Sequence, residues 1–192
     1  MTCVDGPGEG IVEVTVTELA MESPTLVRPG REPDVTALLN RVEQPSPELA
    51  RFFYRSVGGP WYWVDRLDWT YGHWSEWTHA QGHEMWTCWV RGAPAGYFEL
   101  DRQGDAVEIA YFGLLPDFIG TGLGGWLLTR ALERAWEVPG TARVWVHTCT
   151  LDGPSALANY VARGFSAERT YVEYRDVSEP PPGPWRGSGL LD

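Results

Sequence analysis

The alternation of hydrophobic and polar positions along the chain predicts a protein that mixes strands and helices. Residues 11–19 (IVEVTVTEL) alternate β-branched and polar side chains, which is the pattern of a strand with one buried face. Residues 22–34 hold three prolines and a glycine, so they predict a loop. The sequence Ser-Pro-Glu at 46–48 is typical of a helix start, and Gly58-Gly59 should end that helix.

Three strand-like segments come next and lead into a turn rich in glycine. Residues 85–92 and 94–103 predict a hairpin joined by Gly92-Ala93-Pro94. A third, apolar strand begins near Val107 and is ended by Pro116. We therefore expect three successive antiparallel strands ahead of the glycines.

An amphipathic helix follows the glycine turn. In residues 123–136 the apolar side chains recur at three- to five-residue steps and fall on one helix face. Residues 143–149 predict a buried strand, which should run parallel to the strand before the glycines because a helix crosses between them. The glycine turn then lies at the carboxyl end of its strand, where open α/β sheets bind ligands. Residues 154–165 predict another helix, and residues 168–177 the last strand or strands.

The composition is that of one globular domain. The 192 residues are 43% hydrophobic, and we expect a flexible tail at 1–10, a domain at 11–177 and a Pro/Gly-rich tail at 178–192. Three widely spaced cysteines do not make a disulfide framework. The sequence has neither a signal peptide nor an apolar run long enough to span a membrane, so we expect a cytoplasmic protein without a membrane partner.

The net charge of −11 changes the choice of partners. It argues against nucleic acid as the main partner, because phosphate backbones attract basic surfaces. An acidic surface instead attracts cationic ligands, including protonated amines.

The glycine turn is the first candidate binding site. The first N–H groups of a helix have no partners within it and carry its positive dipole end, so a glycine-rich helix start favours a phosphate. No Lys follows the glycines, which excludes the P-loop pattern, and the preceding Pro and Asp make a poor dinucleotide fingerprint. The sequence Ile119 to Gly124 resembles the acyl-coenzyme A loop of the GNAT acetyltransferase superfamily, [QR]-x-x-G-x-[GA], with Ile119 in place of the usual Gln or Arg.

A second resemblance to GNAT proteins lies in residues 154–165 (PSALANYVARGF). It matches the family segment N-x-x-A-x-x-L-Y-x-x-x-G-F at four positions, and it departs where Gly153 replaces Asn and Asn159 replaces Leu; the matches are Ala156, Tyr160, Gly164 and Phe165. In the family the tyrosine protonates the departing thiolate, a role that falls on Tyr160 here. The alternative is a tyrosine packed on a helix with its hydroxyl bonded elsewhere.

The resemblance implies a GNAT fold: a mixed, mostly antiparallel sheet of six or seven strands, with helices on both faces and a splayed central strand pair. The pantetheine arm of acetyl-CoA would insert between the splayed strands, and no metal is expected. The backbone of Leu114 would polarise the thioester carbonyl. The full set implied for the cofactor is Leu114, Leu115, Ile119, Gly120, Thr121, Gly122, Leu123, Gly124, Gly125 and Tyr160.

Acyl transfer to an amine also needs a base. Glu108 is the one charged residue in the apolar stretch 106–116, an unfavourable placement unless the carboxylate is paired or used. It lies eleven residues before Ile119, as the catalytic glutamate of histone-type GNAT enzymes lies before their loop. Glu99 and His147, expected on the two neighbouring strands, are the other candidates.

Residues 60–89 hold seven of the eleven tryptophans and predict an aromatic lid with a short helix near 75–80. So many aromatic rings either fill a core or line a pocket, and both readings stay open. As a pocket, the segment would offer Trp61, Trp63 and Asp65 to a cationic acceptor. Its three histidines show no metal-binding spacing, so we expect no metal there.

These observations predict an N-acetyltransferase that moves an acetyl group from acetyl-CoA to the primary amine of a small molecule, by direct attack in a ternary complex. Two alternatives remain: a transferase that uses aminoacyl-tRNA or a carrier-protein thioester as donor, and a GNAT-fold protein that binds acyl-CoA without turnover. A nucleotide-binding module is a weaker third. Homodimerisation is possible.

Overall fold

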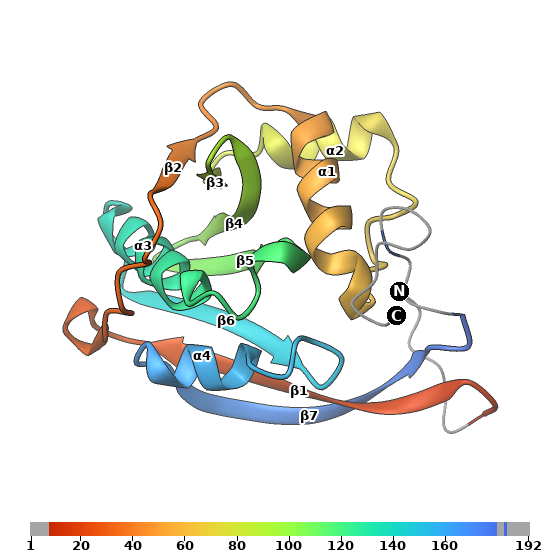
Figure 1. Cartoon of the computed structure of the whole chain (residues 1–192). Coiled ribbons are helices and arrows are strands. Elements are labelled where there is room, and N and C mark those ends of the chain that lie inside the picture. Colours follow the sequence, from red (N-terminus) through yellow and green to blue (C-terminus); the bar gives the residue numbers. More distant parts are fainter. Residues whose placement is uncertain (1–7, 180–182, 184–192) are drawn as a thin grey trace.

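Seven strands pair into one sheet in the computed structural model of the chain, which describes residues 8–179 and residue 183 (Figure 1). In sheet order the strands are β2 (Ala37–Arg41), β3 (His83–Val90), β4 (Ala93–Gln103), β5 (Ala106–Leu114), β6 (Arg143–Cys149), β1 (Ile11–Met21) and β7 (Ser166–Asp176). The helices are α1 (Pro47–Gly58), α2 (Tyr71–Thr78), α3 (Leu123–Glu137) and α4 (Ala156–Ala162). Most of the two predicted tails lies outside the described residues.

The pairing of the strands confirms the predicted mixed sheet. All neighbouring strands are antiparallel except β5 and β6, which run parallel with α3 crossing between them. The expected hairpin is β3–β4, but its turn is Arg91-Gly92, so the predicted connection at Gly92-Ala93-Pro94 is wrong by one residue. Both turn residues have positive φ, 51° and 84°, as a type I′ hairpin turn requires.

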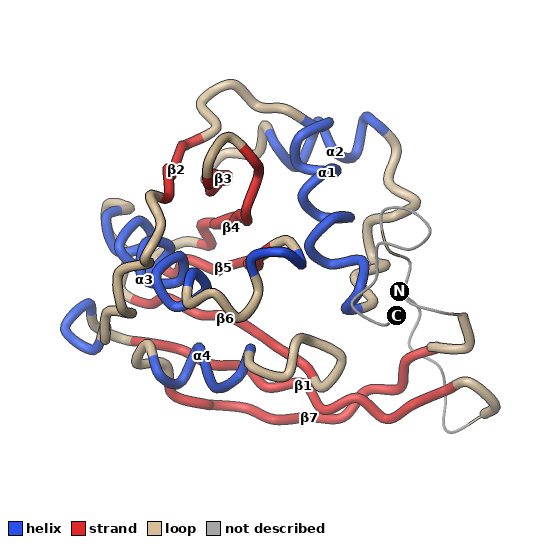
Figure 2. Tube along the Cα trace, in the orientation of Figure 1, coloured by secondary structure: helices blue, strands red, loops and turns tan. Residues whose placement is uncertain are grey.

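The first strand lies far from the second along the sheet. β1 sits between β6 and β7 and is antiparallel to both, so the two ends of the domain are joined in one region of the sheet (Figure 2). Its alternating burial, with Val14 and Val16 buried, confirms the predicted half-buried strand. The edge strand β2 was not predicted, because five residues with exposed Leu38 carry too short a pattern.

Helix starts follow the local capping chemistry. The Ser46 hydroxyl accepts the Leu49 N–H, and α1 ends at Gly58 as expected. Helix α2 begins four residues earlier than predicted. Its cap is Thr70, whose hydroxyl accepts the His73 N–H while His73 Nδ1 faces the Thr70 N–H, a capping box closed by histidine in place of the usual Glu or Gln. No helix in the described part of the chain is long and apolar enough to cross a membrane.

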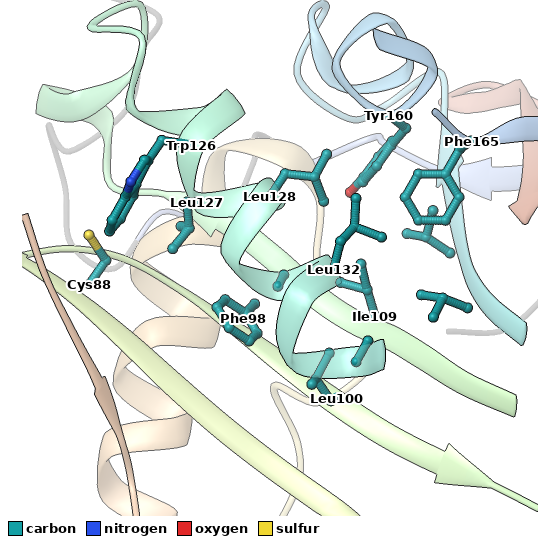
Figure 3. Close-up of a cluster of buried hydrophobic side chains, with 14 of the residues drawn as sticks. Cys88, Phe98, Leu100, Ile109, Trp126, Leu127, Leu128, Leu132, Tyr160 and Phe165 are labelled. Atoms are coloured by element: carbon teal, nitrogen blue, oxygen red, sulfur yellow. The ribbon is translucent and has the colours of Figure 1, made fainter. Parts of the chain in front are cut away.

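Two hydrophobic cores lie on the two faces of the sheet. Neighbouring residues of β4 point to opposite sides, so Phe98 packs under α3 and Tyr97 packs under α1 and α2. Figure 3 shows the first core, in which the apolar face of α3 meets side chains of β4, β5 and α4. On the other face, α1 approaches β5 at Gly113, where a Cβ would lie 2.4 Å from Val57 Cγ1.

The parallel pair β5–β6 separates after three residues. Its paired positions run only from Ala106–Arg143 to Glu108–Trp145. A register shift in the β4–β5 ladder leaves Ala110 as an extra residue just beyond this point, and such bulges bend a strand away from its neighbour. The remainder of β5, as far as Leu114, therefore has one edge free of β6. This is the predicted splayed strand pair.

Candidate active site

A cavity of about 850 Å³ occupies the opening between β5 and β6. Its lining combines the glycine turn and α4 from one face of the sheet with Trp61, Trp63 and Tyr171 from the other. One continuous space therefore reaches both faces through the splayed strands.

The glycine turn forms one end of the cavity. Gly120 and Gly122 have φ of 79° and 84°, a region that side chains disfavour, and nothing lies within 4 Å of a Cβ added at either. Gly122 is also the N-cap of α3, with no side chain capping the free N–H groups of the first turn. The open space and free donors fit the diphosphate of an acyl-coenzyme A, which these backbone groups would hold.

The remaining residues predicted for the cofactor divide into two groups. Leu114, Ile119, Gly124 and Gly125 line the cavity. Three others do not, since each is engaged elsewhere. The Leu115 N–H donates to the Ala95 carbonyl at 2.9 Å, the Thr121 hydroxyl donates to the Phe118 carbonyl at 2.7 Å, and the Leu123 side chain is buried in the core.

Tyr160 reaches the cavity from α4 and is 6% exposed. Its ring packs edge-on against Phe112 and Phe165, at 6.1 and 5.9 Å between centroids, and Figure 3 shows its hydroxyl on the α3 side of the cluster. Burial, reinforced by the charge of Asp152, raises the pKa of Tyr160 well above its usual value. The phenol therefore stays protonated at neutral pH and can donate a proton.

Glu108 and His147 come together at the closed end of the splayed strands. Glu108 is the last β5 residue paired with β6, and its carboxylate does not line the cavity. Its Oε2 accepts a hydrogen bond from Gln103 at 2.8 Å, and its Oε1 lies 3.4 Å from His147 Nδ1. His147 does line the cavity. The bond to Glu108 is the main cause that raises the pKa of His147 above its usual 6.5.

Glu99 lies outside the cavity, beneath the tryptophan-rich segment. It is 1% exposed. Its Oε2 accepts a hydrogen bond from Trp77 Nε1, 2.5 Å away, and lies 3.1 Å from His83 Nε2. Arg66 Nη1 lies 4.0 Å from the same oxygen. The carboxylate is thus held in a buried polar cluster outside the cavity.

The tryptophan-rich segment contributes side chains both to a hydrophobic core and to the cavity lining. Trp74 is 2% exposed in the second core, whereas Trp61 and Trp63 line the cavity, and residues from His83 onward form β3. Trp63 Nε1 donates to Asp152 Oδ1 at 3.3 Å, which fastens this wall to the loop after β6. Asp65 Oδ1 lies 3.9 Å from Arg175 Nη1, and both residues line the cavity.

Known proteins identify the fold. The model of the acetyltransferase (GNAT) family matches residues 46–165, which is more than half of the chain. The chain belongs to that family. No curated protein matches the sequence.

Several solved structures share the fold of this GNAT chain at low sequence identity. A GCN5-related N-acetyltransferase from Sphaerobacter thermophilus matches with a TM-score of 0.65 and 15% identity, over 91% of this chain and 55% of its own. One from Kribbella flavida gives 0.61 and 18%, over 88% and 61%. A functionally unknown conserved protein from Staphylococcus epidermidis gives 0.64 and 16%, over 88% and 64%. This chain therefore spans 55–64% of the length of these three structures.

Several cavity residues of this GNAT domain were not predicted from the sequence. Tyr171, Glu173 and Arg175 alternate along β7 and line the mouth. Their alternation is visible in the sequence, but the sequence does not show that β7 pairs with β1. Asp152, which holds Trp63, Thr148 and the Cys149 N–H, had no motif at all. Among the described residues, no group of three or more His, Cys, Asp or Glu side chains could hold a metal ion.

Proposed function

We propose that this GNAT protein transfers an acetyl group from acetyl-CoA to the primary amine of a small molecule, in a ternary complex. The observation that carries the proposal is the continuity of the cavity, which joins the glycine turn at the start of α3 to His147 and to the aromatic wall on the other face. Donor and acceptor can then meet between the splayed strands without a covalent enzyme intermediate.

His147 is the base in this proposal, and Glu108 positions it. Since Nδ1 faces the Glu108 carboxylate, the neutral ring keeps its proton on Nδ1 and leaves Nε2 free to take the proton of the acceptor amine. The sequence predicted Glu108 as the base. In this proposal Glu108 acts only through His147, because its own carboxylate does not line the cavity.

Acetyl-CoA, when bound, supplies an activated thioester. The glycine turn would hold its diphosphate through the α3 N–H groups, and the free edge of β5 near Leu114 would offer backbone groups to the acyl end. Tyr160 would give its proton to the sulfur that leaves, which suits a phenol whose raised pKa keeps it protonated.

The charges around the acceptor end support a cationic amine. The cavity is lined there by three carboxylates, Asp65, Asp152 and Glu173, and by Arg175 as the one arginine in the lining. The aromatic rings of Trp61 and Trp63 add surfaces that attract cations. A small amine that carries a positive charge matches this environment better than an anionic acceptor does.

The test is release of free coenzyme A thiol from acetyl-CoA in the presence of aliphatic diamines, aromatic ethylamines and a lysine peptide. We expect amine-dependent thiol release, lowered at least about a hundredfold in kcat by His147→Gln. His79→Gln, at an exposed position outside the cavity, is the matched control and should act like wild type. Binding of coenzyme A without transfer to any amine would refute the proposed catalysis.

A further inference from the structure

Arg163 follows α4 and packs against the first turn of α3. A Cβ added to Gly125 would lie 2.3 Å from Arg163 Nη1, so only glycine leaves room for the guanidinium there. Nη1 donates to Asn159 Oδ1 at 3.4 Å, and the other amide atom of Asn159, Nδ2, donates to the Gly124 carbonyl at 3.4 Å. Asn159 thus links the guanidinium to the glycine turn.

The electrostatics of this position favour an anion. The start of α3 is the positive end of its dipole, and a cation placed beside it is repelled. Among the described residues the Arg163 side chain donates to Asn159 Oδ1 and forms no ion pair, and its buried Nε has no hydrogen-bond partner. The Arg163 backbone is fixed as well, because its carbonyl accepts the Arg28 N–H at 3.0 Å. One guanidinium therefore lies beside a helix N-terminus, with no ion pair to a carboxylate of the described residues.

We propose that Arg163 binds the diphosphate of coenzyme A, together with the α3 N–H groups. This inference rests on the proposed function and assigns a residue of this chain to its cofactor. Ile119 occupies the position where the family loop carries Gln or Arg, so the loop itself lacks a long polar side chain there. Arg163, just after α4, supplies a positive group beside Gly125, at the edge of the cavity that Gly125 and Asn159 line.

Calorimetric titration with coenzyme A measures the contribution directly, without any need for turnover. Arg163→Gln should weaken binding roughly tenfold or more, the loss expected for a charge-assisted hydrogen bond. Arg134 lies about 16 Å along α3 from the start of the helix at Leu123. Arg134→Gln removes the same charge and should leave the affinity for coenzyme A unchanged. Equal losses in both variants would refute a specific contact, because they would report net charge alone.

Dephospho-coenzyme A, which keeps the diphosphate and lacks the 3′-phosphate, locates the contact. The same fold loss with this ligand supports the diphosphate assignment. Disappearance of the loss would overturn it and move Arg163 to the 3′-phosphate.

Gly125→Ala provides a second test that keeps the charge. The new methyl displaces the far end of a flexible side chain, so the protein should fold, and alanine suits the helical backbone at this position. We expect Gly125→Ala to weaken coenzyme A binding in the wild type and to weaken it much less in the Arg163→Gln background. Equal effects in both backgrounds would show that the methyl acts on the ligand and not through Arg163.

The two proposals fail in different ways. If the wild type does not bind coenzyme A, the proposed function fails. If the wild type binds and Arg163→Gln binds equally well, only the role of Arg163 is refuted.

Discussion

Arg66 offers a sharp test of what holds the tryptophan-rich segment on the sheet. Its guanidinium carbon lies 4.3, 3.9 and 4.4 Å from the ring centroids of Trp69, Trp77 and Tyr111. Its Nη1 lies 4.0 Å from Glu99 Oε2, and the two side chains are 11% and 1% exposed. The buried guanidinium therefore stacks on aromatic rings and also pairs with the Glu99 carboxylate of β4.

Arg66→Met removes the charge and keeps an unbranched side chain. A desolvated cation–π contact is worth about 2 kcal/mol or more. Loss of one partner of a buried ion pair typically costs about 3–5 kcal/mol when the other charge is left without compensation. Glu99 would keep its contacts to Trp77 and His83, so the loss should lie at the lower end of that range. The two effects share one guanidinium and do not add, so we expect the free energy of unfolding to fall by roughly 3 kcal/mol.

Urea unfolding of Arg66→Met, Glu99→Gln and the double variant separates the two effects. If the buried carboxylate causes most of the loss, Glu99→Gln in the Arg66→Met background should recover roughly 1–3 kcal/mol. Single-variant losses that add to within about 0.5 kcal/mol would refute the pairing argument. Arg169→Met is the matched control: Arg169 also stacks on a tyrosine and approaches a glutamate, but it is 66% exposed, so its loss should stay below about 1 kcal/mol.

Three further predictions concern single residues. Tyr160→Phe should lower kcat roughly a hundredfold while the affinity for coenzyme A stays unchanged in calorimetry; an unaltered kcat would exclude Tyr160 as the proton donor. Gly164→Ala should lower the free energy of unfolding by at least about 2 kcal/mol in urea titrations, since φ is +108° and the new Cβ would lie 2.0 Å from the Leu26 carbonyl oxygen; a wild-type midpoint would contradict this. Because the neutral ring of His147 is the base and Glu108 raises its pKa above 6.5, kcat/KM should rise with pH through that raised pKa. Glu108→Gln should move the rise to lower pH, and an unmoved profile would count against the pair.

Local chemistry explains why much of the fold was predictable. A serine cap before Pro47, the glycines of the α3 turn and the apolar face of α3 each act within a few residues, so the sequence displays them directly. The order of strand, glycine turn, helix and strand then determines the parallel neighbours β5 and β6. The family resemblance added the splayed pair.

Long-range pairing explains what the sequence concealed. Nothing in residues 11–21 indicates that they pair with both β6 and β7, and the site residues of β7 depend on that placement. The bulge at Ala110 has a further effect. Simple alternation would put Glu108 and Phe112 on one face, but the extra residue puts Glu108 on the face of Tyr111 instead. Glu108 therefore meets His147 and does not face the cavity, a relation that spacing along one strand cannot reveal.

The opening between β5 and β6 is maintained by packing on both sides of the sheet. Strand β5 is anchored in both cores, because Ile109 is buried beneath α3 and Tyr111 packs with the aromatic cluster beneath α1 and α2. Strand β6 is held separately by β1, along six paired positions from Val144 to Cys149. To close the gap, one strand would have to leave a packed core or break a ladder, and both are costly. The space for the donor and the acceptor is therefore part of the folded state, and binding energy need not be used to create it.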